Sequence, residues 1–335
     1  MTETMTAQAR IPSTIGARAS RPRAEIFCYG TMVLIGIALW WGSTFHASIM
    51  PFWAPFDFSP LWFASAALSL YWYARGIALS APGERPALWR STSFLLGVGV
   101  IYFVLQTRFE YLAEHMFFLN RAQHVAMHHL GPFLIAIAWP GAMLKRGMPV
   151  AVRNAFYWRP LKILLAIVQQ PFLAAVLFVG LIALWLWPPV HFRAMIDPRL
   201  YAVMNWSMVV DGILFWYLVL DPRPAPPARI SYGARAVLTI TVMFPQIIIG
   251  AMIVFAHHDL YSFYTWCGRI FPSVGALDDQ QYGGLIVWIP PAMMSVVALI
   301  WVINMLRLSE EAAIAAKEGN GAEGVVFSSR EWTGR

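Results

Sequence analysis

Long apolar runs alternate with short polar segments along most of the chain. A lipid bilayer core is crossed by about 20 apolar residues of helix. Within such a run every backbone polar group must be paired internally, which predicts helices rather than open strands. The pattern therefore predicts an all-α, polytopic integral membrane bundle of about eight transmembrane helices, or seven if the short third run does not cross. The runs lie near 27–45, 60–80, 92–107, 117–143, 163–187, 201–220, 235–256 and 284–306.

Composition and boundaries agree with one membrane domain. Hydrophobic residues make up 59% of the chain and charged residues 12%, against about half and a quarter in soluble domains. We expect a disordered cytoplasmic tail at 1–25, the transmembrane domain at 26–308 and a flexible cytoplasmic tail at 309–335. The sequence has no P-loop and no plausible dinucleotide fingerprint, and nothing in it indicates a hydrolase or a kinase.

Basic residues are distributed unevenly between the predicted loops. The eight-helix arrangement places 19 of the 24 lysines and arginines on the face that also carries both termini. Cytoplasmic loops carry such an excess, so we expect both termini in the cytoplasm and the protein in the inner (plasma) membrane. This bias accounts for the net charge of +7, and no nucleic-acid partner is needed to explain it. Cys28 and Cys267 then lie at opposite faces and cannot pair.

All eight histidines fall at or near the opposite, outer face. Imidazole is a common ligand of transition metals, and methionine sulfur favours Cu(I). On a helix, residues three or four apart share a face, and an i, i+4 histidine pair can chelate one metal ion. The densest stripe is formed by Met116, Asn120, His124 and His128, with Gln123 and Met127 beside it.

We therefore expect copper at His124 and His128. Further ligands would be Met116, Met127 or the pair His257 and His258, which end the seventh predicted helix at the same outer depth. The competing interpretation is an ordinary outer helix end whose polar groups meet water or neighbouring helices.

An acidic residue inside the sixth predicted helix is a second candidate. A carboxylate within a membrane is expensive and usually faces a cavity or a partner, so Asp211 is singled out. With Tyr201, Asn205 and Met208 it forms a polar stripe that could meet the stripe of the fourth helix. A simple hydrogen bond between helices is the alternative.

Several motifs resemble one protein family. A QH pair followed by GPFLIAIAWP, then GILFWYLVLDP, ISYGARAVLTITVMFPQIIIGAMIVF and LDDQQYGGLIVWIP, are similar, in this order, to the CtaG family of cytochrome c oxidase assembly factors. The resemblance extends over about 58–306. It implies a membrane assembly factor rather than an enzyme, with the catalytic subunit of a haem-copper oxidase as its partner. It also implies assistance in copper delivery, for which a periplasmic copper carrier is a further candidate partner.

The resemblance brings further residues into the predicted site. The family pattern HMVQH reads NRAQH here, with Asn120 in place of the first histidine and with Gln123 retained. Where the family has an EH pair, this chain has Met204 and Asn205. His128 restores an i, i+4 pair one turn deeper. The last motif implies functional roles for Asp279, Gln280 and Gln281. Without the resemblance, these residues would be interpreted as the N-terminal cap of a helix.

Two other function classes stay open. One is a redox protein that holds a b-type haem between histidines such as His124 and His257. The other is a small-solute transporter with a site at mid-membrane near Asp211. The order of the motifs favours the assembly factor. The inner half of the predicted bundle is also almost wholly apolar, whereas a transporter should show polar residues in both halves.

Overall fold

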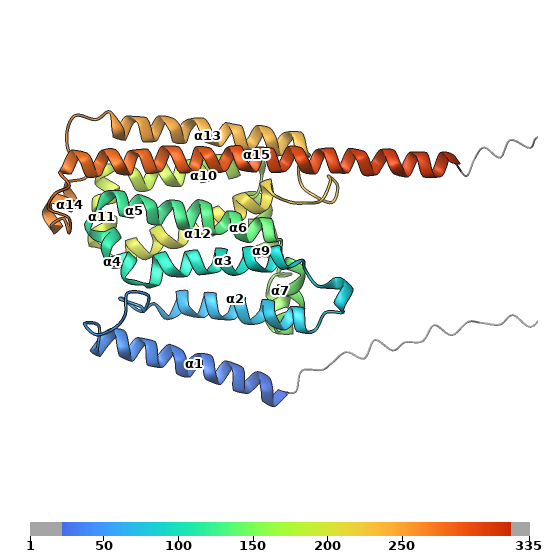
Figure 1. Cartoon of the computed structure of the whole chain (residues 1–335), viewed down its shortest axis with the longest axis horizontal. Coiled ribbons are helices and arrows are strands. Elements are labelled where there is room, and N and C mark those ends of the chain that lie inside the picture. The colour runs from blue at the N-terminus through green and yellow to red at the C-terminus, as the bar shows by residue number, and fades with distance from the viewer. Residues whose placement is uncertain (1–21, 323–335) are drawn as a thin grey trace, which may run out of the picture.

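The computed structural model describes residues 22–322, and this part of the chain is helical without a β-strand. The longer helices lie roughly along one axis (Figure 1). They are α1 (Pro22–Phe45), α2 (Pro60–Ala78), α3 (Leu88–Gln106), α10 (Pro171–Leu186), α12 (Pro198–Val219), α13 (Tyr232–Val254) and α15 (Ala276–Ala322).

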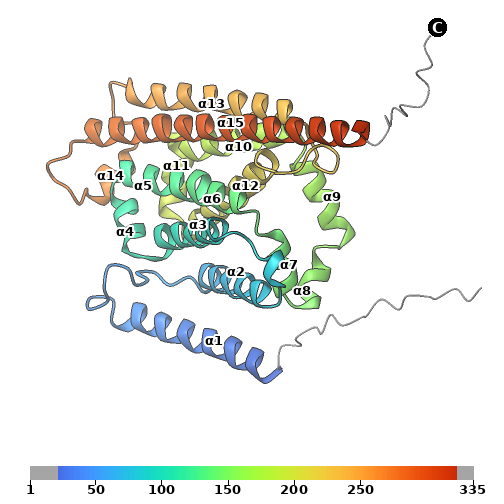
Figure 2. The same cartoon turned by 45° about the vertical axis from the view of Figure 1, so that its right-hand side comes forward.

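One further passage through the bundle consists of three consecutive pieces. α5 (Phe117–His124) leads into the π-helical turn η2 (Val125–Leu130), which leads into α6 (Gly131–Ala138). Short helices join the passages, and Figure 2 shows α7, α8 and α9 together at one end. The short helices are η1 (Pro82–Glu84), α4 (Arg108–His115), α7 (Gly141–Gly147), α8 (Val150–Ala155), α9 (Arg159–Val168), α11 (Pro188–Ile196) and α14 (Ser262–Cys267).

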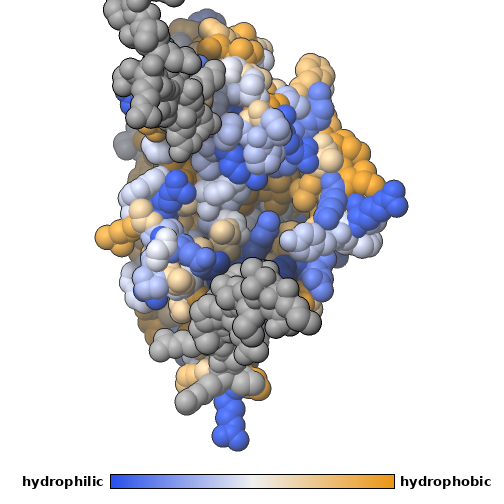
Figure 3. Space-filling view, turned by 90° about the vertical axis from the view of Figure 1, so that its right-hand side faces the viewer, coloured by the Kyte–Doolittle hydropathy of each residue, from blue (hydrophilic) through white to orange (hydrophobic). Residues whose placement is uncertain are grey.

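The two ends of the bundle differ in character. α1 begins and α15 ends at the same end, termed here the tail end, and hydrophilic residues gather across the part of that face visible in Figure 3. The opposite end, termed the histidine end, is formed by the segments 46–59, 107–116, 187–197 and 255–275. The arrangement agrees with the prediction that both terminal segments leave on one face.

The all-α membrane bundle is confirmed, whereas the number of spans depends on the criterion. Five described helices (α1, α3, α12, α13 and α15) are long and apolar enough to cross a membrane, and α9 with α10, bent by 75°, makes a sixth if the pair is one span. α2 and the α5–η2–α6 passage run between the same two ends (Figure 1) but do not meet this criterion. α2 carries Arg75 and several tyrosines and tryptophans, and the other passage is broken and rich in polar residues.

Local sequence explains several helix ends. Asp197 precedes α12, and its carboxylate accepts the backbone N–H of Arg199 at 2.9 Å. Ser231 caps α13 in the same way through the N–H of Ala234, at 3.3 Å. Such side chains satisfy donors that the first turn of a helix leaves without partners. Arg235, near the start of α13, donates hydrogen bonds to the carbonyls of Ile230 and Arg223. These bonds connect the loop at the tail end to α13.

Close packing at glycines brings α13 and α15 together. A Cβ added to Gly250 would lie 2.9 Å from the carbonyl oxygen of Gly284 and 2.7 Å from Cβ of Trp288. Small residues allow such approach between membrane helices. By contrast α1 lies at the edge of the bundle (Figure 1), and only 11% of its apolar window is buried. The candidate functional site is accordingly formed by α3 and the elements that follow it in the chain.

The last described helix extends into the predicted C-terminal tail. The tail was expected to begin at residue 309, and α15 continues to Ala322. The run contains several alanines, which favour helix, and an i, i+4 ion pair joins Arg307 and Glu311 at 3.8 Å. The start of α1 likewise takes in residues 22–25 of the predicted N-terminal tail. Predictions for 1–21 and 323–335 fall outside the described residues.

Candidate functional site

A π-helical turn interrupts the passage that carries three of the histidines. Such turns hold extra backbone per turn and often occur at functional sites. Pro132 supplies a local cause, because it has no N–H for the carbonyl of His128 and its ring crowds that carbonyl. The wider turn at Val125–Leu130 changes which side chains share a face. The cavity beside this turn is lined by His124 and His129, five positions apart, whereas His128, the partner that a regular helix predicts, does not line it.

A small cavity lies where this turn meets α10, α12, α13 and α15. Its volume is about 20 Å³, which is enough for one water molecule, since one water needs roughly 10–15 Å³. Its walls are mostly apolar. A space of this size suits a single ion or water molecule and is far too small for a haem. The polar groups around it belong to Arg121, His124, His129 and Gln246, and Met208 also lines it.

His124 and His129 present free ring nitrogens in this buried region. His124 is 5% exposed, and neither of its ring nitrogens has a hydrogen-bond partner within the described part of the chain. His129 contacts the side-chain oxygen of Gln246 through Nε2 at 2.8 Å. The Gln246 amide nitrogen donates to Val242, so its oxygen is the group that faces His129. Nε2 of His129 is then the donor, which leaves Nδ1 with a free lone pair.

His128 faces a different neighbour. Its Nε2 lies 3.1 Å from Oδ2 of Asp211, and its ring stacks on Phe178 with centroids 4.3 Å apart. A carboxylate that accepts from the outer nitrogen of a histidine is the arrangement that orients metal-binding imidazoles. Gly212 allows this contact, since a Cβ there would come within 2.3 Å of the carbonyl oxygen of His128. Asp211 of the α12 stripe and His128 of the α5–η2–α6 stripe are thus in contact, which is the simple interhelix hydrogen bond given as the alternative interpretation of Asp211.

The other predicted ligands do not converge with these histidines. Met116 and Met127 are fully buried, but neither lines the cavity. His257 and His258 are exposed after the end of α13. Among residues 22–322 no group of three or more His, Cys, Asp or Glu side chains is arranged to hold a metal ion. A site of two imidazoles and one thioether would have fewer ligands and the softness that suits Cu(I).

The polar residues in the first turns of α5 tie it to its neighbours. Gln123 donates to the carbonyl of Val104 at 2.8 Å and accepts from the hydroxyl of Tyr201 at 3.3 Å. Asn120 is fully buried and accepts a hydrogen bond from Arg121. Asn205, on α12, is 2% exposed, and its side-chain oxygen has no partner in the described structure. These residues surround the cavity without lining it.

The last sequence motif joins α15 to two other elements. Asp279 is fully buried and accepts the backbone N–H groups of Phe117 and Phe118, at 3.1 and 2.8 Å. It thus caps α5 from α15, across sequence separations of 162 and 161 residues. Gln280 accepts from the N–H of Leu260 at 2.8 Å and donates to the carbonyls of Ile253, in the last turn of α13, and His258. Gln281 is exposed.

Acidic side chains gather at the histidine end, outside the apolar helices. Glu110 and Glu114 lie on α4, and Asp57 lies in the segment before α2. Burial and the nearby charge of Asp57 raise the pKa of Glu114 to about 7. Burial, followed by the charges of Glu114 and Asp57, raises the pKa of Glu110 well above its ordinary value. Part of this cluster therefore carries protons near neutral pH.

Sequence reasoning did not single out Arg121 or Gln246, and it chose His128 over His129 for the copper pair. Arg121 could have been found from the sequence, because an arginine within an apolar run requires explanation. The GP pair at Gly131–Pro132 was a possible sign of a distorted helix. Gln246 carries no comparable signal, because its role depends on α13 packing beside η2.

One comparison with known proteins identifies a family. The family model described as cytochrome c oxidase caa3 assembly factor (Caa3_CtaG) matches residues 70–307. Two uncharacterized proteins, from Mycobacterium bovis and Mycobacterium tuberculosis, are each 24% identical over 253 residues, which is 71% of this chain and 37% of the relative. The chain thus spans well under half the length of these relatives. No solved structure matches the chain.

Proposed function

The chain belongs to the family of cytochrome c oxidase caa3 assembly factors, and on this premise we propose that it assists copper delivery to the catalytic subunit of a haem-copper oxidase. Membership supports a role in oxidase assembly, and no catalytic activity is proposed. Copper is treated as cargo that is bound and passed on. The observation that carries the proposal is the buried His124, both of whose ring nitrogens lack a partner among the described residues.

We propose that His124, His129 and Met208 bind Cu(I) as it passes through. All three line one cavity with room for a single ion. Two imidazoles with one thioether sulfur form a soft ligand set of low coordination number, which favours Cu(I) over divalent ions. His128, oriented by Asp211, keeps Nδ1 free and is a candidate ligand at an earlier or later step. The proposed copper pair is thus His124 and His129, in place of the pair His124 and His128 predicted from the sequence.

The proposed orientation places the histidine end outside the cytoplasm. The excess of basic residues at the tail end supports this orientation. Copper would then arrive from the outer side, either as a free ion or from a periplasmic copper carrier. The lipid bilayer and the immature oxidase subunit are the other proposed partners.

A deletion strain tests the function. Without the protein, the oxidase polypeptide and its haem should be present while activity and oxidase-bound copper are low, because haem alone cannot replace copper in the oxygen-reducing centre. Added copper should restore part of the activity by mass action. Normal activity in the deletion strain under copper limitation, with no second homologue present, would contradict the proposal.

Variants of the purified protein test the cargo site. His124→Ala combined with His129→Ala should lower Cu(I) affinity at least tenfold, a loss on the scale of removing even supporting groups around a metal. His257→Ala is the matched control, because His257 is exposed and lies outside the cavity lining. Equal copper retention by the wild type and the double variant would exclude this site.

A further inference from the structure

We propose that Arg121 keeps the affinity of the cavity for Cu(I) low, so that the cargo is released rather than stored. This inference rests on the proposed cargo function. Arg121 and His124 are three residues apart on α5, which places them on one face of the helix. Both line the same cavity. A cation in the cavity would therefore share a small space with a guanidinium group.

The positive charge of Arg121 is shielded from water. The residue is 2% exposed, and its guanidinium carbon lies 5.1 Å from the centre of the Phe117 ring. One terminal nitrogen donates to Asn120, while Nε has no partner within residues 22–322. An aromatic face and a neutral amide oxygen stabilise a cation without neutralising it.

Carboxylates that could neutralise Arg121 are engaged elsewhere. Asp279 pairs with Arg269 at 3.2 Å, and Asp211 contacts His128 at 3.1 Å. In the described part of the chain Arg121 forms no ion pair. The titratable oxygens that face it are the hydroxyls of Tyr201, Tyr261 and Tyr264. These phenols are neutral at physiological pH, since their ordinary pKa is about 10.

The consequence for a bound metal follows from Coulomb's law. Two unit charges several ångströms apart repel strongly at the effective dielectric of a protein interior, and Arg121 and the proposed ligands line the same small cavity. Imidazole and thioether ligands are neutral and do not offset the charge of Cu(I). The ligand set alone would bind Cu(I) tightly, and Arg121 opposes that binding. A carrier that must transfer its cargo requires this balance.

Arg121→Gln tests the inference directly. The affinity for Cu(I) is measured on the full-length purified protein by competition with a bicinchoninate chelator. Loss of the charge should tighten binding by about 10- to 100-fold, as expected from the repulsion of two unit charges at this range. Release of Cu(I) to excess chelator should slow correspondingly. Arg121→Lys keeps the charge and should stay within about threefold of the wild type.

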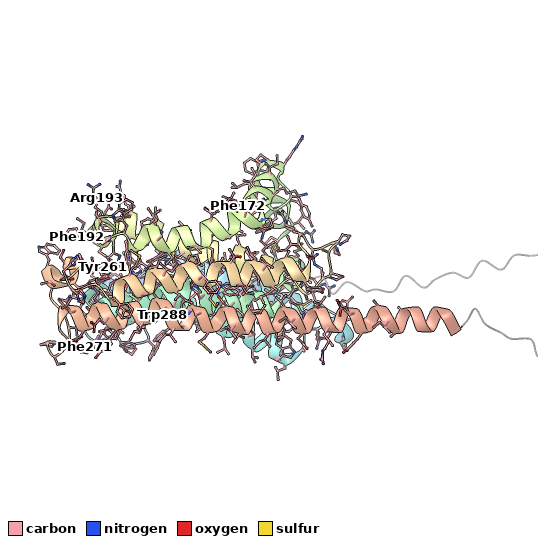
Figure 4. The ribbon with its side chains drawn as sticks, turned by 90° about the horizontal axis from the view of Figure 1, so that it is seen from above. Phe172, Phe192, Arg193, Tyr261, Phe271 and Trp288 are labelled. Carbon is pink, nitrogen blue, oxygen red and sulfur yellow. The ribbon has the colours of Figure 1, made fainter. Side chains whose placement is uncertain are left out.

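Arg193→Gln is the matched control. Arg193 is exposed on α11 at the histidine end, where Figure 4 shows it extending away from the helices, and it does not line the cavity. The control removes the same charge and should leave the affinity unchanged. Arg121→Leu replaces Arg121→Gln if the latter does not fold, because leucine leaves no unsatisfied amide beside Phe117.

The outcomes separate the two proposals. If the wild type binds Cu(I) and neither Arg121→Gln nor Arg121→Leu binds it more tightly, the role of Arg121 is overturned while the cargo site stands. If affinity rises equally in Arg193→Gln, the effect is one of net charge and the inference is also overturned. If the wild type and all variants fail to bind Cu(I), both the cargo function and the inference fall.

Discussion

The buried polar side chains near the cavity are of two kinds. In some, the polar atoms have hydrogen-bond partners, and in others they have none among the described residues. Asp279 accepts three hydrogen bonds and Gln280 uses both its oxygen and its nitrogen, which marks them as structural. His124 uses neither ring nitrogen. A buried polar group without a partner destabilises the fold, and this observation supports the proposed role of His124 as a ligand.

Asp279→Ala should destabilise the protein. The change removes the cap of α5 and leaves Arg269, whose side chain is 12% exposed, without its partner. Breaking a buried ion pair typically lowers the free energy of unfolding by about 3–5 kcal/mol. Reversible unfolding in detergent micelles measures the loss. Asp278→Ala is the control, because Asp278 is exposed and contacts only the N–H of Gly275, at 3.3 Å, so the loss should stay below about 1 kcal/mol. Equal losses would contradict the capping role.

Glu114 should make stability depend on pH. Its pKa is raised to about 7 by burial and by Asp57, whereas the unfolded chain has a pKa of about 4.3. Between these values the folded protein binds more protons than the unfolded chain, so stability falls as pH rises from about 4.5 to 7 and levels off above. In Glu114→Gln the decrease in melting temperature between pH 5 and pH 8 should be smaller. An unchanged decrease, equal to that of the exposed Glu310→Gln, would show that Glu114 is not responsible.

Among the secondary-structure elements, η2 and the glycine contacts decide what the site contains. The π turn brings His129 to the cavity and directs His128 to α12. The close contact of α13 with α15 at Gly250 keeps Gln246 and Val287 on the walls of that cavity. Figure 4 shows α13 and α15 side by side, with Trp288 partway along α15.

Gly250→Ala and Gly180→Ala should have opposite effects. A Cβ at Gly250 would lie 2.7 Å from Trp288 and 2.9 Å from a backbone oxygen, so α13 and α15 must separate. Overpacking of this kind costs about 1–3 kcal/mol. A Cβ at Gly180, on α10, meets nothing within 4 Å, and replacing a mid-helix glycine by alanine is worth up to about 1 kcal/mol of stabilisation. Detergent unfolding measures both, and a stabilising Gly250→Ala would contradict the close packing.

At the scale of the whole molecule, the two cysteines report the proposed orientation. Cys267 is exposed on α14 at the histidine end, and Cys28 lies near the start of α1 at the tail end. A membrane-impermeant maleimide applied to intact spheroplasts should label Cys267 and leave Cys28 unlabelled until the membrane is opened. Because partial desolvation of the Cys267 thiol and the charge of Glu114 raise its pKa, labelling should be faster at mildly alkaline pH.

Cys267→Ser is the control for this labelling, because it should abolish the signal from intact spheroplasts. Labelling of Cys28 in intact spheroplasts that carry Cys267→Ser would invert the proposed orientation. A reporter that is active only outside the cytoplasm, fused after Arg335, should likewise give no signal.

The pattern along the chain was sufficient for the helical bundle and for the enrichment of histidine at one end. Both depend on the local order of apolar, basic and imidazole side chains. It also indicated that Asp211 has a partner on another helix, since a carboxylate in an apolar helix needs one, and His128 is that partner. The pattern predicted the number of membrane-spanning helices less well than it predicted the bundle. Helices that pack around a polar site, such as α5, carry fewer apolar residues.

Tertiary structure alone decided which side chains share the cavity. Sequence spacing assumes 3.6 residues per turn, whereas the turn beside Pro132 is wider, and His129 rather than His128 lines the cavity with His124. His257 and His258, which were predicted to lie at the same depth as these histidines, are exposed beyond the end of α13. The capping of Phe117 by Asp279 joins residues 162 positions apart. Such contacts depend on how helices pack against one another, and helical periodicity describes only one helix at a time.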